Sequence, residues 1–165
     1  MSSFIKKMCI AAILTALCTL ATTFISIPTG TVGNINLGDC ICFAACMLLG
    51  LWYGPAVGAL GGGIADLLSG YAVYCPVTVV AKGLMGIVLC VIMGKKYSFL
   101  RAVLGMVLGG ACMVLCYFLY EWALYGFAAA LPNVAFNFVQ TGINAVLVAA
   151  LYPIIKKTSK VRREH

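Results

Sequence analysis

The sequence predicts an all-α integral membrane protein, a compact bundle of six transmembrane helices. Of its 165 residues, 64% are hydrophobic and 9% are charged, whereas a soluble domain is about half apolar and a quarter charged. The mean hydropathy is +1.09, and apolar runs long enough to cross a bilayer recur along the chain. These observations exclude an ordinary water-soluble enzyme, a nucleic-acid-binding protein and a disordered tail.

Six apolar segments are expected to form a single membrane domain over residues 1–165. The first follows Lys6 and Lys7, as a signal peptide would, but it is long enough to span a bilayer and is expected to be retained. Pro55, Pro76 and Pro132 are each expected to begin a helix, because proline is tolerated best there. The expected spans are about 5–26, 37–52, 55–70, 76–94, 99–121 and 133–155.

The breaks between these spans have turn-forming or charged sequences. Residues 28–33 contain a proline and two glycines, residues 52–55 read Trp-Tyr-Gly-Pro, and residues 70–76 run from a glycine to a proline. Two lysines occupy the break at 95–98. The fifth break, residues 121–132, is less sharply marked because residues 123–131 are apolar.

The basic residues predict the orientation. Ten of the eleven lysines and arginines fall in three clusters, within residues 6–7, 95–101 and 156–163. With a cytoplasmic amino terminus, all three clusters lie inside, as the positive-inside rule requires. We therefore expect a multi-pass protein of the cell membrane with both termini cytoplasmic. Asp39, Asp66 and Glu121 then lie at or near outer helix ends.

Lys82 needs a specific explanation. It lies six residues beyond Pro76, so at a rise of about 1.5 Å per residue it sits roughly 9 Å inside the outer end. A lysine at the middle of a membrane helix costs about 2.5–3.5 kcal/mol. An ion pair with Asp66 or Glu121, or a side chain extended outward, would offset this cost. The alternative is an ammonium that faces a ligand in an outward-open cavity.

The last span has a row of carboxamides on one helical face. Asn133, Asn137, Gln140 and Asn144 follow the spacing i, i+4, i+7, i+11. Because carboxamides in lipid would lack hydrogen-bond partners, this row is expected to face the interior, where it either bonds to other helices or lines a cavity. Tyr117 and Glu121 lie at a similar depth.

These polar groups gather in the outer half of the membrane, which favours a small-molecule pocket over a continuous channel. The candidate substrate-binding residues are Asn36, Asp66, Tyr74, Lys82, Tyr117, Glu121, Asn137, Gln140 and Asn144. No catalytic residue, metal site or cofactor is expected. The lone histidine, His165, ends the chain, no phosphate-binding loop is present, and most of the nine cysteines lie in apolar segments as packing residues.

The chain resembles the S component, the substrate-binding membrane subunit, of energy-coupling factor (ECF) vitamin transporters, in particular the riboflavin-type group. The most specific stretches are residues 36–55, 65–71 and 76–86. Ala12 and Ala16 match the family's A-x-x-x-A pattern on the first helix.

The resemblance implies a subunit, not an enzyme, that captures a vitamin or vitamin precursor from outside. It further implies docking through Ala12 and Ala16 on a membrane coupling subunit bound to two cytosolic ATPases, whose ATP use tips the S component and releases substrate inward. The expected substrate is a small heterocycle, pyridoxine or hydroxymethylpyrimidine, with riboflavin or pantothenate next. The alternatives are a stand-alone secondary carrier or small channel that forms a homo-oligomer, and a membrane scaffold that transports nothing.

Overall fold

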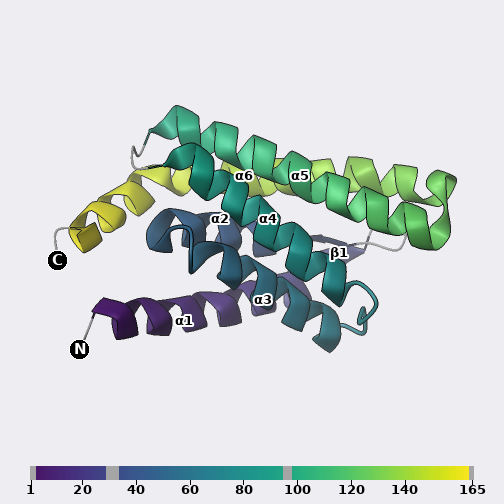
Figure 1. Cartoon of the computed structure of the whole chain (residues 1–165), viewed down its shortest axis with the longest axis horizontal. Helices are drawn as coiled ribbons and strands as arrows, with labels where there is room; N and C mark the ends of the chain where they lie inside the picture. Colours follow the sequence, from purple (N-terminus) through teal and green to yellow (C-terminus); the bar gives the residue numbers. More distant parts are fainter. Residues whose placement is uncertain (1–2, 29–33, 95–97, 164–165) are drawn as a thin grey trace.

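A computed structural model describes residues 3–28, 34–94 and 98–163 of the chain (Figure 1). Within these residues the chain forms six α-helices and two short strands. The elements in chain order are α1 (Ser3–Phe24), β1 (Ser26–Pro28), β2 (Asn34–Asn36), α2 (Gly38–Leu49), α3 (Gly54–Leu68), α4 (Cys75–Met93), α5 (Phe99–Tyr125) and α6 (Phe127–Arg163). The prediction of an all-α bundle of six helices is therefore confirmed.

The helices pack as a bundle around α2. Helix α2 contacts α1, α3, α4 and α6, while α4 lies between α3 and α5 and α6 lies along α5. Helix α1 begins and α6 ends at one end of the bundle, and the β1–β2 hairpin and the α5–α6 connection lie at the other (Figure 1). For the rest of the article, these are the terminal end and the hairpin end.

The six helices differ in length. Helices α1, α4, α5 and α6 each contain an apolar stretch long enough to cross a membrane, whereas α2 and α3 have 12 and 15 residues. At a rise of about 1.5 Å per residue, α2 is only about 18 Å long, against a hydrocarbon core of about 30 Å. The six expected spans are thus four full-length helices and two short ones.

Two boundaries differ from those expected. Helix α5 continues to Tyr125, and only Gly126, with a φ of 87°, separates it from α6. The prediction that Pro132 begins the last helix is wrong, because Pro132 lies inside α6. The apolar residues 123–131 extend both helices instead of forming a loop. Pro55 and Pro76 do lie in the first turns of α3 and α4.

The β1–β2 hairpin was not expected from the sequence. Ser26 pairs with Asn36 and Pro28 with Asn34 in an antiparallel register. The hairpin takes the place of the last turn expected for the first helix, which ends at Phe24. It also brings Asn34 and Asn36 toward the helices at the hairpin end, where they help to form the cavity described below.

Glycines allow several pairs of helices to approach each other closely. A Cβ atom added at Gly54 would lie 2.3 Å from Cys46 Cα, and one added at Gly58 would lie 2.2 Å from Cys42 Sγ. A Cβ added at Gly109 of α5 would lie 2.6 Å from the Met85 carbonyl oxygen of α4. Such contacts exclude any side chain, as at other close helix crossings in membranes.

Candidate functional site: a polar cavity at the hairpin end

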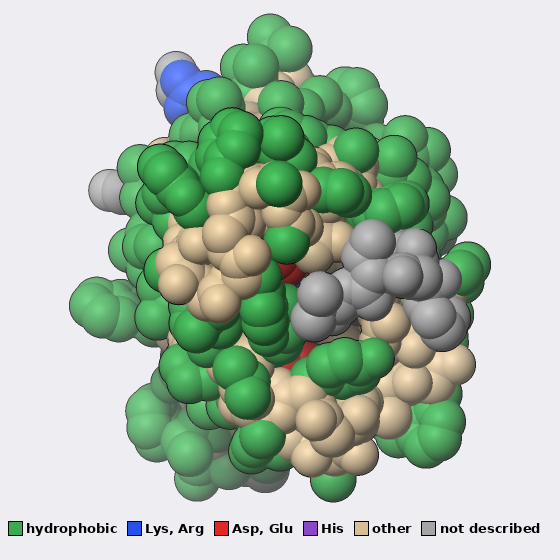
Figure 2. All heavy atoms as spheres, turned by 90° about the vertical axis from the view of Figure 1, so that its right-hand side faces the viewer, with side chains coloured by type: hydrophobic (Ala, Val, Ile, Leu, Met, Phe, Trp, Pro, Cys, Tyr) green, Lys and Arg blue, Asp and Glu red, His purple; other side chains and the backbone are tan. Residues whose placement is uncertain are grey.

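A cavity of about 80 Å³ lies among the helices at the hairpin end. Figure 2 shows the molecule from this end, with red carboxylate side chains visible inside a hollow. The lining residues come from six elements or from the turns beside them, namely β2, α1, α3, α4, α5 and α6. The lining residues are Thr22, Asn34, Asn36, Asp66, Ser69, Tyr71, Tyr74, Thr78, Tyr117, Glu121, Asn133, Phe136, Asn137 and Gln140.

The structure brings seven of the nine candidate binding residues to this cavity. Lys82 and Asn144 are the two that do not line it. Both are buried instead, with exposed fractions of 2% and 0%. The seven that line the cavity are Asn36, Asp66, Tyr74, Tyr117, Glu121, Asn137 and Gln140.

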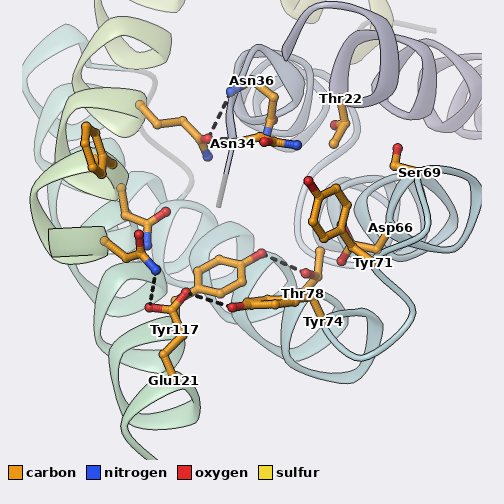
Figure 3. A pocket seen from close by; sticks show the side chains of 14 residues that line it. Thr22, Asn34, Asn36, Asp66, Ser69, Tyr71, Tyr74, Thr78, Tyr117 and Glu121 are labelled. Atoms are coloured by element: carbon orange, nitrogen blue, oxygen red, sulfur yellow. Dashed lines mark hydrogen bonds between the residues drawn. The ribbon is translucent and has the colours of Figure 1, made fainter. Parts of the chain in front are cut away.

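Hydrogen bonds fix the polar side chains on the α4–α5–α6 side of the cavity (Figure 3). Asn133 Nδ2 donates to Glu121 Oε2 at 3.0 Å, and Tyr74 Oη donates to Glu121 Oε1 at 3.4 Å. Burial, reinforced by the Glu121 carboxylate, raises the pKa of Tyr74, so its hydroxyl stays protonated and acts as the donor. Tyr117 Oη donates to Thr78 Oγ1 at 2.8 Å. Both oxygens of Glu121 are therefore already engaged by the protein.

Lys82 is paired with an acid other than those expected. Its Nζ lies 3.0 Å from Asp39 Oδ1, and both side chains are buried. The expectations of a pair with Asp66 or Glu121, and of a side chain extended outward, are wrong. Gly62 explains the direction that the side chain takes, because a Cβ there would lie 2.7 Å from Lys82 Cδ. The missing side chain leaves room for the lysine to reach the start of α2.

Gln140 connects this ion pair to the hairpin. Its Nε2 donates to Asp39 Oδ2 at 2.7 Å, and its Oε1 accepts bonds from the backbone and side-chain nitrogens of Asn36 at 3.0 and 3.2 Å. Gln140 also lines the cavity. One side chain thus belongs both to the cavity wall and to the buried polar cluster behind it.

Asn144 fixes the start of α2 to α6. Its Oδ1 accepts a hydrogen bond from the Cys40 backbone N–H at 2.8 Å. This N–H lies in the first turn of α2, where backbone N–H groups have no partner within the helix. Asn144 Nδ2 donates to the Asn36 carbonyl oxygen at 2.9 Å. We call Asn36, Asp39, Lys82, Gln140 and Asn144 the buried network. Interhelical bonding therefore accounts for Gln140 and Asn144, whereas Asn137 of the same row lines the cavity.

Several lining residues were not among the candidates. Tyr71 and Asn133 lie beside the candidates in the sequence, and the spacing of Asn133 already placed it on the same helical face. Thr78 lies one turn before Lys82 on α4, which is the signal that was available for it. Thr22 and Ser69 had no such signal, because hydroxyl residues are common in membrane helices. The others are Asn34 and Phe136.

The fold defines a small multi-pass membrane protein with a polar cavity at one end of an apolar bundle. Residues 2–157 match the family described as ECF-type riboflavin transporter, S component, and the chain belongs to this family. It is therefore a component of a transporter and not an enzyme.

Individual relatives agree with this assignment. The thiamine precursor transporter HmpT of Lactococcus lactis subsp. cremoris is 30% identical over 156 residues, which cover 93% of this chain and 90% of HmpT. An uncharacterized protein from Pyrococcus woesei is 32% identical over 143 residues, covering 84% of this chain and 94% of that protein. The solved S component of a bacterial ECF transporter has the same fold, with a TM-score of 0.76, 17% identity, and coverage of 92% of this chain and 96% of that one.

Proposed function

We propose that this ECF S component binds a vitamin or vitamin precursor in the cavity at the hairpin end and delivers it inward together with a coupling subunit and two ATPases. The observation that carries the proposal is the cavity itself, a group of polar side chains among otherwise apolar membrane helices. Polar groups at membrane depth are costly and mark sites of function. The apolar core that lies between this cavity and the terminal end argues against a continuous channel.

The proposed substrate is a small heterocycle, hydroxymethylpyrimidine first and pyridoxine second. The lining of the cavity combines amide, hydroxyl, carboxylate and aromatic side chains, a mixture that suits a small aromatic ring with polar substituents. The amide and hydroxyl groups along its wall offer both donors and acceptors to ring nitrogens and substituents. The name of the relative HmpT, a thiamine precursor transporter, favours hydroxymethylpyrimidine over pyridoxine.

The proposed orientation places both termini in the cytoplasm and the cavity toward the outside. Lys6 and Lys7 at the start of α1, Arg101 at the start of α5, and Lys156 and Lys157 near the end of α6 belong to the terminal end. Positive charge at that end supports a cytoplasmic location. The remaining basic residues of the second cluster, at 95–96, lie outside the described residues.

The proposed docking surface for the coupling subunit is a groove between α1 and α3 that contains Ala12 and Ala16. The groove has a volume of about 730 Å³ and is lined almost wholly by apolar and small side chains. A membrane helix of the partner would cover it, since small residues allow close helix approach. The lining residues are Met8, Ala11, Ala12, Thr15, Ala16, Thr19, Leu20, Tyr53, Ala56, Val57, Leu60 and Ile64.

Two measurements test the transport proposal. Mass spectrometry of small molecules that remain bound to the purified chain is expected to detect a vitamin or a vitamin precursor. Uptake of hydroxymethylpyrimidine by cells that express the chain is expected to require the ECF ATPases. Uptake that persists without those ATPases would instead support the stand-alone carrier or homo-oligomeric channel. Absence of any saturable binding would support a scaffold that transports nothing.

Replacing Ala12 and Ala16 with leucine tests the docking surface. Both alanines are exposed in the isolated chain, so the leucines are expected to leave folding and ligand binding unchanged while uptake and co-purification with the coupling subunit are lost. Ala150→Leu is the matched control, because Ala150 is also exposed on a membrane helix but lies outside the groove. Loss of ligand binding in the double variant would show that the α1 face is needed for the fold.

A further inference from the structure

The cavity has an unbalanced charge. Asp66 and Glu121 line it, and among the described residues no lysine, arginine or histidine does. Lys82 of α4 does not line the cavity, and its ammonium group pairs with the buried Asp39 carboxylate. The cavity therefore presents carboxylates without a lining cation.

The two carboxylates differ in what they still offer to a ligand. Both oxygens of Glu121 accept hydrogen bonds, from Tyr74 and Asn133. Asp66 Oδ2 is buried and accepts no hydrogen bond from the described residues. A buried acceptor without a hydrogen-bond donor is rare in proteins, so its presence needs an explanation. Asp66 thus lines the cavity with one carboxylate oxygen that no described residue holds by a hydrogen bond.

The two carboxylates lie on different walls of the cavity. Asp66 lies on α3 and Glu121 on α5, on opposite sides of the cavity (Figure 3). The buried hydroxyl of Thr22, which also lines the cavity, has no hydrogen-bond partner among the described residues either. A ring between these walls would place its edge substituents against Asp66 on one side and against the Glu121 cluster on the other.

We infer that the cavity selects nitrogen heterocycles that carry no negative charge and present an N–H donor to Asp66, such as amino-substituted pyrimidines. This inference rests on the proposed function and narrows its substrate class. Carboxylate or phosphate groups would face two carboxylates in a membrane environment of low dielectric constant, where like charges repel strongly. The inference therefore removes pantothenate from the substrates considered above, and it also excludes phosphate esters.

The first test uses the purified full chain in detergent and isothermal titration with three probes. The probes are 4-amino-5-hydroxymethyl-2-methylpyrimidine, its monophosphate and pantothenate. We expect the neutral aminopyrimidine to bind at least about a hundredfold more tightly than either anion. Equal or tighter binding of an anionic probe would overturn the charge selection while leaving vitamin binding intact. If none of these probes, pyridoxine or riboflavin binds, the proposed function itself fails, and this inference fails with it.

The second test assigns the role of Asp66. The measurement is the ratio of affinities for the 4-amino probe and for its 4-oxo analogue, which presents an acceptor in place of the amino donor. Asp66→Asn is expected to lower this ratio at least about tenfold, because it replaces a charged acceptor by an amide. Asp66→Glu, which keeps the carboxylate, is expected to retain most of the preference.

A ratio measured on one protein sample is insensitive to partial loss of folded protein, so reduced yield of a variant does not decide the outcome. An unchanged ratio in Asp66→Asn would overturn the role of Asp66. If Asp66→Asn does not fold, the ratio in Asp66→Glu and the wild-type discrimination against the 4-oxo analogue decide instead. Absence of any preference for the amino probe in the wild-type chain would overturn the inference.

Discussion

Asp39 and Asp66 show how the same residue type acquires two roles at the hairpin end. Asp39 is fully buried, pairs with Lys82 and accepts a hydrogen bond from Gln140. Asp66 lines the cavity, and one of its carboxylate oxygens has no hydrogen-bond partner among the described residues. The first aspartate is held by an ion pair and a hydrogen bond within the protein, and we have proposed that the second binds a ligand. The presence of an acid at the hairpin end of a membrane helix does not by itself indicate binding.

The buried network and the cavity depend on each other. The network holds β2 and the start of α2 against α6 through Asn36, Gln140 and Asn144. The same side chains form, or support, one wall of the cavity. Rigid support behind a binding wall reduces the ordering that a ligand must impose. The following predictions separate the two regions, beginning with the largest expected effect on stability.

Lys82→Met is expected to destabilise the protein most. It leaves the Asp39 carboxylate buried without its countercharge, a loss of about 3–5 kcal/mol in protein interiors. The measurement is the temperature at which the purified protein loses its monodisperse peak in size-exclusion chromatography. The double variant Lys82→Met/Asp39→Asn, which removes both charges, is expected to recover most of the stability. A single variant as stable as the wild type would contradict a structural role for the pair.

Asn144→Leu is expected to have an intermediate effect on stability and little direct effect on binding. It leaves the Cys40 N–H and the Asn36 carbonyl without their partner, at about 1–3 kcal/mol for each unsatisfied group. Thermal unfolding in detergent measures this loss, and titration of the folded fraction measures affinity. A large loss of affinity with unchanged stability would show that Asn144 contacts the ligand after all.

Asn137→Leu is the matched substitution on the cavity side of the same helix. Asn137 lines the cavity, whereas Asn144 is fully buried behind it. Loss of the Asn137 amide is expected to change stability by no more than about 0.5 kcal/mol and to weaken ligand binding about tenfold, the value of one hydrogen bond. Titration and thermal unfolding of the same sample check both effects. If Asn137→Leu behaved like Asn144→Leu, the distinction between network and cavity would be wrong.

The sequence was sufficient for the fold class and for the grouping of most of the candidate polar residues at one end of the bundle. Hydropathy depends on local composition, and the spacing of Asn137 and Gln140 alone places both on one face of a helix. It was not sufficient to predict where the Lys82 side chain points, because the position of a residue along a helix does not give the angle of its side chain around the helix axis. That angle depends on Gly62 of α3, which leaves space on one side only. The partner, Asp39, lies on a different helix from the acids considered.

Two further features were not expected from the sequence. The hairpin strands have three residues each, too few to produce a detectable alternation. The α5–α6 boundary falls at Gly126 because the apolar residues around it extend both helices, so Pro132 is accommodated inside α6.

The shortness of α3 has a consequence for the surrounding lipid, because this helix of 15 residues has exposed apolar side chains, whereas no residue of the central helix α2 is exposed. The turn that precedes α3 presents Trp52, whose side chain is 85% exposed, and tryptophan prefers the headgroup region. The apolar surface of the protein is therefore shorter on the α3 side than along the longer helices. On that side, either the bilayer thins or the molecule leans, at a cost of fractions of a kcal/mol per ångström of mismatch. Bilayer thickness thus becomes a variable that sets the resting tilt of the protein.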